Sequence, residues 1–483
     1  MNLVYLSLAP ALLAPALVAP GIGTRAARSI APLALFGVSA IQAAAAIGLA
    51  FTATSSAPLV AGYLTTDATA RLFLVLINVI FFGIAGYVWN RARTTPELKD
   101  VVSKFARLSL LFMAAANFVV LSNHLLAGWV ALEVTTIAAA PLIIREGVPS
   151  SRRASWRYFL FSSVGLGIAL VGLTCLGRSL EADSTTPTFF LHELREMAAT
   201  PPNLWRRIGV ALIVLGYGTK LGLAPMYSWL PETYDEAPPA VTALLAAVQF
   251  NCTLVCLIRV LQAYRGGDSE LASTELLVMG LLSMAVSTVS IIATRNFERL
   301  IAYASINHAG VIAIGLAIGK SASYGVMLYL VSNAFIKAIL FLTAGKIEAH
   351  YGTKDTREIA GLIKDLPYSG LFLMVGTLAL LGFPPFGSFL GELIILSGLV
   401  RAKQITVFVV FCTLVSLSFV ATGRSVFPMI WGEPRKEVRW PRQPFIAAAP
   451  KLAFLAALVA MGIYMPRPVN ALFREVAASL GAE

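Results

Sequence analysis

A lysine lies inside an apolar stretch of the chain at Lys220, in the run Gly216-Tyr-Gly-Thr-Lys-Leu-Gly-Leu-Ala-Pro225. Carrying a lysine to the centre of a bilayer costs about 2.5–3.5 kcal/mol on insertion scales, so such residues generally serve a function. The glycines and Pro225 are expected to break the helix, and an ionisable group at a broken helix is typical of an ion pathway. Burial disfavours the ammonium and a nearby carboxylate favours it, so Lys220 is predicted to exchange a proton when a neighbouring charge moves. The alternative is a lysine whose ammonium reaches the membrane surface, which the apolar runs on both sides disfavour.

A carboxylate lies in an earlier apolar stretch at Glu133, within Gly128-Trp-Val-Ala-Leu-Glu-Val-Thr-Thr136. An unpaired carboxylate is costly at membrane depth, so this group must face a partner or water, or be protonated. Glu133 is predicted to carry protons close to Lys220. The alternative is a structural ion pair that only locks the two helices together.

Three further ionisable residues lie within apolar segments of the second half, at His308, Lys337 and Glu392. Histidine titrates near neutral pH with little perturbation, so His308 is predicted to pass protons between the halves. A lone histidine is more often a satisfied core residue, and that alternative stays open. Glu392 follows a second expected helix break, at Pro384 and Pro385.

Three polar residues are expected to support this line of ionisable groups. Asn251 can hold water but cannot titrate, Asn333 lies in the same run as Lys337, and Arg259 is predicted at the membrane interface near a helix end. The pattern predicts a hydrated track across the bilayer midplane with openings at the broken helices. Its members in chain order are Glu133, Lys220, Asn251, His308, Lys337 and Glu392.

The composition requires a helical membrane protein. Of 483 residues, 58% are hydrophobic and only 13% charged, and the mean hydropathy is +0.78, whereas soluble domains carry about 25% charged residues. About fourteen apolar segments are long enough to span, which leaves no room for a soluble domain. The expected spans are 2–22, 29–51, 72–91, 106–122, 124–144, 156–177, 207–229, 239–262, 275–294, 299–319, 323–344, 369–396, 405–431 and 448–465.

The two expected breaks lie five helices apart, which predicts two five-helix units. An odd number of helices inverts the second unit relative to the first, as in secondary transporters. In this arrangement Glu133 corresponds to His308, and Lys220 corresponds to Glu392. The predicted divisions are 1–105 with three helices, 106–262 as the first repeat, 275–431 as the inverted repeat, and 448–483 with the last helix and a C-terminal tail.

The net charge of +12 reflects membrane sidedness rather than nucleic-acid binding. Basic residues gather in alternate short connections, as the positive-inside rule expects. This places both termini outside and requires an even number of helices. The groups expected on one side are Arg25 and Arg28; Arg91 to Arg107; Arg145 to Arg157; Arg295 and Arg299; Lys346 to Lys364; and Arg435 to Arg442.

The sequence predicts no cofactor, no metal site and no catalytic residue of its own. Cys252 and Cys256 are one helical turn apart, which is neither a redox nor a zinc spacing, and all four cysteines lie in apolar surroundings. The chain contains no glycine-rich nucleotide loop and no cysteine run for an iron–sulfur cluster.

These residues resemble the antiporter-like, proton-conducting subunits shared by respiratory complex I, membrane-bound hydrogenases and multisubunit cation/proton antiporters. The resemblance covers about two thirds of the chain, and its wording is most similar to component F of hydrogenase-4. The strings that carry it are Trp129…Glu133, Gly218-Thr-Lys-Leu-Gly-Leu-Ala-Pro225…Trp229-Leu-Pro-Glu232, Glu236-Ala-Pro238, Arg299-Leu-Ile-Ala-Tyr303, Ala334-Phe-Ile-Lys337 and Gly382-Phe-Pro-Pro-Phe-Gly387…Glu392.

The resemblance implies a fourteen-helix fold in a bacterial plasma membrane, with paired half-channels and with other subunits as partners. The family's glutamate and lysine would be Glu133 and Lys220, and its central histidine would be His308. Many relatives have lysine where this chain has Asn251 and histidine where it has Asn333. Three functions stay open: a proton-translocating subunit of a redox-driven complex, an ion-gradient-coupled transporter subunit with a soluble partner, and a scaffold that no longer conducts. The transported ion, proton or sodium, is also open.

Overall fold

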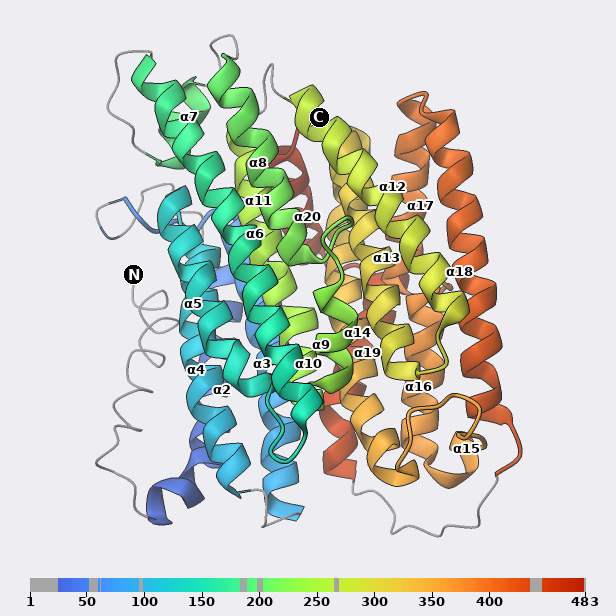
Figure 1. Ribbon diagram of the computed structural model, residues 1–483. Coiled ribbons are helices and arrows are strands. Elements are labelled where there is room, and N and C mark those ends of the chain that lie inside the picture. The colour runs from blue at the N-terminus through green and yellow to red at the C-terminus, as the bar shows by residue number, and fades with distance from the viewer. Residues whose placement is uncertain are drawn as a thin grey trace.

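The computed structural model describes residues 25–51, 60, 62–94, 99–182, 189–197, 203–264, 269–434 and 445–481. Over these residues the chain is a bundle of long helices (Figure 1), and strand pairing is limited to isolated bridges such as Leu64 with Ser122. The all-helical prediction is therefore confirmed. The first expected span, 2–22, lies outside the described residues.

Ten of the described helices are long and apolar enough to cross a membrane. Most of these helices carry apolar side chains on every face, so they are stable only when packed against other helices or surrounded by lipid. They are α2 (Arg25–Ala50), α3 (Ala68–Thr94), α4 (Lys99–Leu121), α5 (Leu125–Ile143), α6 (Pro149–Ala182), α12 (Ser269–Ala293), α13 (Phe297–Ile318), α14 (Ser323–Tyr351), α18 (Ile405–Trp431) and the continuous segment formed by α10 (Pro239–Ala243), η4 (Leu244–Gln249) and α11 (Phe250–Ala263).

The chain is interrupted at both positions where glycine and proline predict a break. The first break separates α8 (Leu204–Leu221) from α9 (Trp229–Glu236), and the second separates α16 (Pro367–Leu380) from α17 (Gly387–Arg401). Each helix before a break ends at a left-handed glycine, Gly222 with φ 77° and Gly382 with φ 67°. Glycine adopts this conformation without the steric cost that a side chain adds, and it is the usual helix terminator.

Close glycine contacts hold the helices beside the breaks. A Cβ at Gly209 of α8 would lie 2.9 Å from the carbonyl oxygen of Gly172 on α6. A Cβ at Gly391 of α17 would lie 2.8 Å from the carbonyl oxygen of Gly325 on α14. Small residues are characteristic of helix contacts in membranes because they let two backbones approach.

The basic connections that the structure describes share one face of the bundle, at the lower side of Figure 1. Arg145, after α5, pairs with Glu348 near the end of α14 at 3.4 Å. The amide of Thr356 donates to the carbonyl oxygen of Arg295, after α12, at 2.8 Å. These contacts join connections that the charge pattern assigns to the same side.

The C-terminal tail carries structure that the sequence did not predict. After α19 (Phe445–Ile463) the chain bends by 75° into α20 (Arg467–Ser479). Glu475 of α20 accepts a bond from Arg71 of α3 at 2.7 Å, and Ser479 accepts one from Gln262 of α11 at 2.6 Å. The tail is therefore anchored to both α3 and α11. Three short helices, α7 (Leu191–Met197), η5 (Lys320–Ala322) and α15 (Leu362–Asp365), complete the described elements.

Candidate functional site

Lys220 lies in the last turn of α8, immediately before the first break. Its side chain is 4% exposed, and its ammonium donates a hydrogen bond to the hydroxyl of Thr136 on α5. The backbone freed by the break is satisfied nearby, because Trp229 donates to the Thr219 carbonyl at 3.0 Å and the amide of Ala224 donates to Ser283 at 2.8 Å. The break is thus fixed inside the protein, which is where a membrane protein tolerates irregular backbone.

Glu133 lies one turn before Thr136 on α5, yet it forms no salt bridge with Lys220. One carboxylate oxygen accepts a hydrogen bond from Ser163 of α6 at 2.7 Å. The other is buried and has no hydrogen-bond partner among the described residues. The glutamate and lysine therefore share one stretch of α5, but they are not locked as a direct ion pair. This geometry disfavours the purely structural pair that the sequence left open.

Gln249 of η4 forms a hydrogen bond with the part of α5 that carries Glu133 and Thr136, and the sequence did not predict its role. Its amide donates to Thr135 at 3.3 Å, and its carbonyl accepts from the buried hydroxyl of Tyr158 at 2.7 Å. Glutamine and tyrosine inside an apolar run give no periodic signal that separates them from packing residues. Glu133 and Lys220 are therefore accompanied by uncharged hydrogen-bonding groups on α5, α6 and η4.

A π-helical turn, η4, ends at Gln249, two residues before Asn251. Such turns are rare and frequently mark functional sites. Asn251 is buried, its amide nitrogen donates to the Ala247 carbonyl at 2.7 Å, and its side-chain oxygen has no partner among the described residues. This free acceptor lies on α11, the last helix of the predicted first repeat.

Lys337 lies deep within α14, and its side chain is 1% exposed. Its ammonium has no hydrogen-bond partner among the described residues and lies 4.0 Å from the centre of the Phe250 ring. A cation over an aromatic face is attracted by the ring quadrupole. Because Phe250 precedes Asn251 on α11, this contact brings the first and second halves together at a buried lysine.

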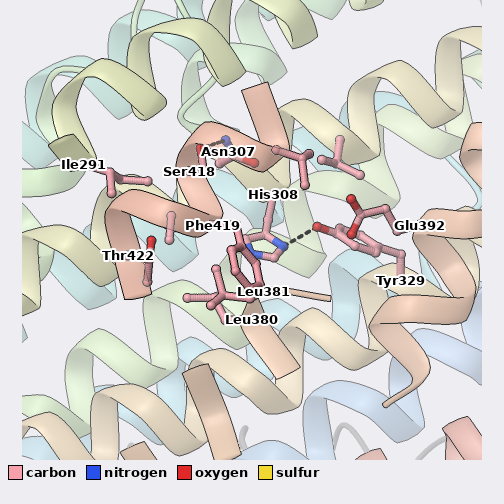
Figure 2. Close-up of a pocket in the computed structure, with 13 residues that line it drawn as sticks. Ile291, Asn307, His308, Tyr329, Leu380, Leu381, Glu392, Ser418, Phe419 and Thr422 are labelled. Carbon is pink, nitrogen blue, oxygen red and sulfur yellow. Dashed lines mark hydrogen bonds between the residues drawn. The ribbon is translucent and has the colours of Figure 1, made fainter. Parts of the chain in front are cut away.

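His308, Tyr329 and Glu392 line one small cavity in the second half (Figure 2). His308 of α13 shares a hydrogen bond through Nδ1 with the hydroxyl of Tyr329 on α14, and Figure 2 shows Glu392 of α17 beside that tyrosine. The cavity volume is about 30 Å³, which exceeds the roughly 10–15 Å³ that a cavity needs to hold a water. The Glu392 carboxylate also faces the second break, because a Cβ at Gly382 would lie 2.7 Å from its Oε2.

Arg259 does not lie exposed at the interface, as its position near a helix end predicted. Its side chain is 3% exposed and pairs with Asp67, which precedes α3, with Nη2 to Oδ1 at 2.8 Å. Burial raises the pKa of Asp67, but the guanidinium of Arg259 lowers it below its usual value overall. Arg259 therefore has a structural partner. Asn333 is buried on α14, and its side-chain oxygen has no partner among the described residues.

The described residues contain no group of three or more histidine, cysteine, aspartate or glutamate side chains that could hold a metal ion. All four cysteines are free thiols. The arrangement thus offers proton-exchanging groups, namely two carboxylates, two lysines and a histidine, spread over α5, α8, α13, α14 and α17.

Residues 122–418 match the family described as NADH:quinone oxidoreductase/Mrp antiporter, TM. The chain belongs to this family. The match contains every ionisable residue of the candidate site and both helix breaks, so the site lies within the part that defines the NADH:quinone oxidoreductase/Mrp antiporter family.

Several curated members of the family are similar over most of their length. The hydrogenase-4 component F homolog of Methylacidiphilum infernorum is 29% identical over 86% of this chain and 89% of its own length. NADH-quinone oxidoreductase subunit N of Salinibacter ruber is 27% identical over 81% and 80%. An Na(+)/H(+) antiporter subunit of Bacillus subtilis is 27% identical over 77% and 74%.

Solved structures of multisubunit membrane complexes share the fold. A chain of the archaeal membrane-bound sulfane sulfur reductase superimposes with a TM-score of 0.86 at 22% identity, covering 99% of this chain and 97% of that one. A chain of the Mrp complex from Dietzia sp. DQ12-45-1b gives 0.84 at 20% identity, covering 99% and 98%. A chain of respiratory complex I from Thermus thermophilus gives 0.81 at 23% identity, covering 99% and 100%.

Proposed function

We propose that this chain translocates protons as a membrane subunit of a redox-driven complex similar to complex I or hydrogenase-4. The observation that carries the proposal is Lys220, a buried ammonium whose hydrogen-bond partner is the uncharged Thr136, with Glu133 one turn away. A lysine in this setting is poised between its charged and neutral forms, because burial favours the neutral form and the carboxylate favours the ammonium. A direct, fully paired ion pair would instead fix the charge.

The proposed route runs from Glu133 and Lys220 past Asn251 to Lys337, and then to His308 and Glu392. The Phe250–Lys337 contact supports the crossing between halves, and the unpaired oxygen of Asn251 supplies an acceptor next to it. The cavity beside His308 supports the exit, because it brings a histidine, a tyrosine hydroxyl and a carboxylate together at a helix break. Buried asparagine cannot titrate, so its role in this route is to orient water or a neighbouring donor.

The proposed plan has fourteen spans, with inverted repeats at 106–262 and 275–431 flanked by 1–105 and 448–483. Matching helix ends at the two breaks support it. Leu223 donates to the Gly218 carbonyl at 2.9 Å, and Phe383 donates to the Leu378 carbonyl at 3.0 Å, each across a left-handed glycine. The same termination motif at corresponding places is expected of a repeated unit. We further place the protein in a bacterial plasma membrane.

A second candidate function is a transporter component powered by an ion gradient, and its specific support is the similarity to an Na(+)/H(+) antiporter subunit. Purifying a tagged copy from its native membrane in mild detergent separates the two. Hydrogenase, quinone-reducing or iron–sulfur subunits in the preparation would support the redox-driven complex. A soluble partner without redox subunits would support the second candidate and overturn the first.

The transport role is tested in the native complex reconstituted into liposomes, where proton uptake is followed with a pH-sensitive dye. Lys220→Met should lower the rate by about 100-fold, the lower end of what a positioned proton-transfer group contributes. Lys364→Met is the matched control, because Lys364 is exposed on the basic face. Proton uptake that survives Lys220→Met in an intact complex would refute the proposed route.

A further inference from the structure

A groove at the basic face lies away from the proton route and has no assigned occupant. Its volume is about 980 Å³, and it opens between the ends of α12 and α18, which lie side by side in Figure 1. The connection after α14 closes its third side through Thr356 to Ala360. The groove is distinct from the small cavity of His308, although consecutive residues of α12 and α18 line the two.

Three arginines and one glutamate are the charged residues that line this groove. Arg295 lies in the connection between α12 and α13, and Arg424 lies on α18. Both side chains are exposed, and neither forms a salt bridge with a described carboxylate. Arg357 pairs with Asp355 at 2.8 Å. Hydrogen bonds from Arg357 hold the pKa of Asp355 at about 2, so this carboxylate is ionised at neutral pH and offsets one arginine. Glu433 also lines the groove. Arg295 interacts with Asp355 through charge alone, so Arg295 and Arg424 are the lining cations that form no salt bridge with a described carboxylate.

The wall of the groove is apolar and lies on the membrane side of the arginines. Ile292, Leu417 and Val420 line it with exposed fractions of 60%, 48% and 65%. Leu417, Val420 and Arg424 share one face of α18, because their spacing is that of successive helical turns. From Leu417 to Arg424 the helix rises by roughly 10 Å. The groove therefore presents cations at the membrane surface and hydrocarbon contacts directly below them.

We propose that this groove binds an anionic phospholipid. The phosphate would lie between Arg295 and Arg424, and an acyl chain would follow Ile292, Leu417 and Val420. Basic pockets between membrane helices bind acidic headgroups by this combination of charge and apolar surface. Free phosphate would use the arginines but would gain nothing from the apolar wall, so the attached chains favour a lipid. An outward face that simply contacts bulk lipid would explain the apolar residues but not the hollow with two available guanidinium groups.

The test uses the full chain in its native complex, placed in nanodiscs of phosphatidylcholine with increasing phosphatidylglycerol. Binding of labelled phosphatidylglycerol is read by fluorescence transfer to a dye beside the groove. Removing one arginine, as in Arg424→Gln, should weaken binding about fivefold, and removing Arg295 as well should weaken it roughly 25-fold. Added salt should weaken binding to the wild type more than to the double variant, because exposed charges are screened.

Two matched variants keep the proposal falsifiable. Arg152→Gln with Arg153→Gln removes two exposed cations from the same face outside the groove, and it should leave binding unchanged. Ala421→Trp fills the wall while keeping both arginines, and it should also weaken lipid binding. Equal loss in the Arg152 and Arg153 control would show unspecific surface attraction and overturn the site. Competition by inorganic phosphate alone, or cross-linking of a partner subunit over Arg424, would also overturn a lipid site.

Discussion

At the scale of single residues, the hydroxyls around the buried ionisable groups decide what those groups can do. Thr136 holds the Lys220 ammonium, Ser163 holds one oxygen of Glu133, and Tyr329 shares a hydrogen bond with His308. A hydroxyl both donates and accepts, so it stabilises either protonation state of its partner. The neighbours of the candidate relay therefore suit groups that change charge.

The tyrosine beside His308 gives a residue-scale prediction. Tyr329→Phe removes one buried hydrogen bond, which should cost about 1 kcal/mol of stability, and should slow proton translocation about fivefold. Tyr324→Phe is the control on the same helix, since its hydroxyl bonds Asn470 at 3.0 Å, away from the cavity. Dye-detected proton uptake in liposomes is the measurement. Equal rates in both variants would remove Tyr329 from the route.

The ionisable residues were predictable from the sequence because charge inside an apolar run is conspicuous. Glu133, Lys220, His308, Lys337 and Glu392 are all found inside the bundle. Their hydroxyl and amide neighbours were not predictable, since threonine, glutamine and tyrosine occur in membrane helices for packing alone. The absence of a salt bridge between Glu133 and Lys220 was not predictable either, because the rotation of each helix about its axis decides which side chains meet.

At the scale of elements, the two helix breaks bring backbone geometry into the site. Both were predictable, because glycine and proline act locally on the chain. The π-helical turn η4 and the amphipathic helix α20 were not. A π turn depends on packing that the sequence does not display, and α20 lies in a polar tail where only its contacts to α3 and α11 identify its role.

The second break gives an element-scale prediction. Gly382→Ala adds a side chain in the left-handed region, which costs about 1–2 kcal/mol, and its Cβ would meet the Glu392 carboxylate. Proton translocation should fall because Glu392 must move. Gly352→Ala is a matched control, as Gly352 has φ 68° and nothing within 4 Å of an added Cβ. Thermal unfolding in detergent should shift alike in both variants, whereas transport should fall only in Gly382→Ala. Unchanged transport in Gly382→Ala would show that the conformation of the second break does not affect proton translocation.

At the scale of the whole molecule, an ionic cluster joins the two halves at the basic face. Lys354 contacts Glu298 of α13 at 2.6 Å, Asp235 of α9 at 3.0 Å and Glu348 of α14 at 3.6 Å. Arg299 adds a second contact to Asp235 at 2.7 Å. Asp235 belongs to the first half of the chain, whereas Glu298 and Glu348 belong to the second. Lys354 therefore links the two halves on this face.

Substitution of Lys354 gives the whole-molecule prediction. Lys354→Met leaves the buried carboxylates of Asp235 and Glu298 without this cation, and breaking a buried pair costs about 3–5 kcal/mol. Unfolding followed by tryptophan fluorescence in detergent should show the loss, whereas Lys364→Met, at an exposed site, should not change stability. A variant as stable as the wild type at neutral pH would show that Arg299 alone satisfies the cluster.

The pH dependence of that loss follows from the groups involved. Burial lowers the pKa of Lys354, but the carboxylates of Glu298 and Asp235 raise it above its usual value of 10.5 overall. Its stabilisation is therefore complete below pH 10.5 and is lost only as pH rises above it. Burial raises the pKa of Asp235, but Lys354 and Arg299 lower it below 3.8 overall, so its stabilisation is lost as pH falls below that value. The gap between wild type and Lys354→Met should narrow as pH falls below 3.8, because a protonated Asp235 no longer needs the cation. A gap that persists in acid would place the cost in lost packing of the lysine stem rather than in charge.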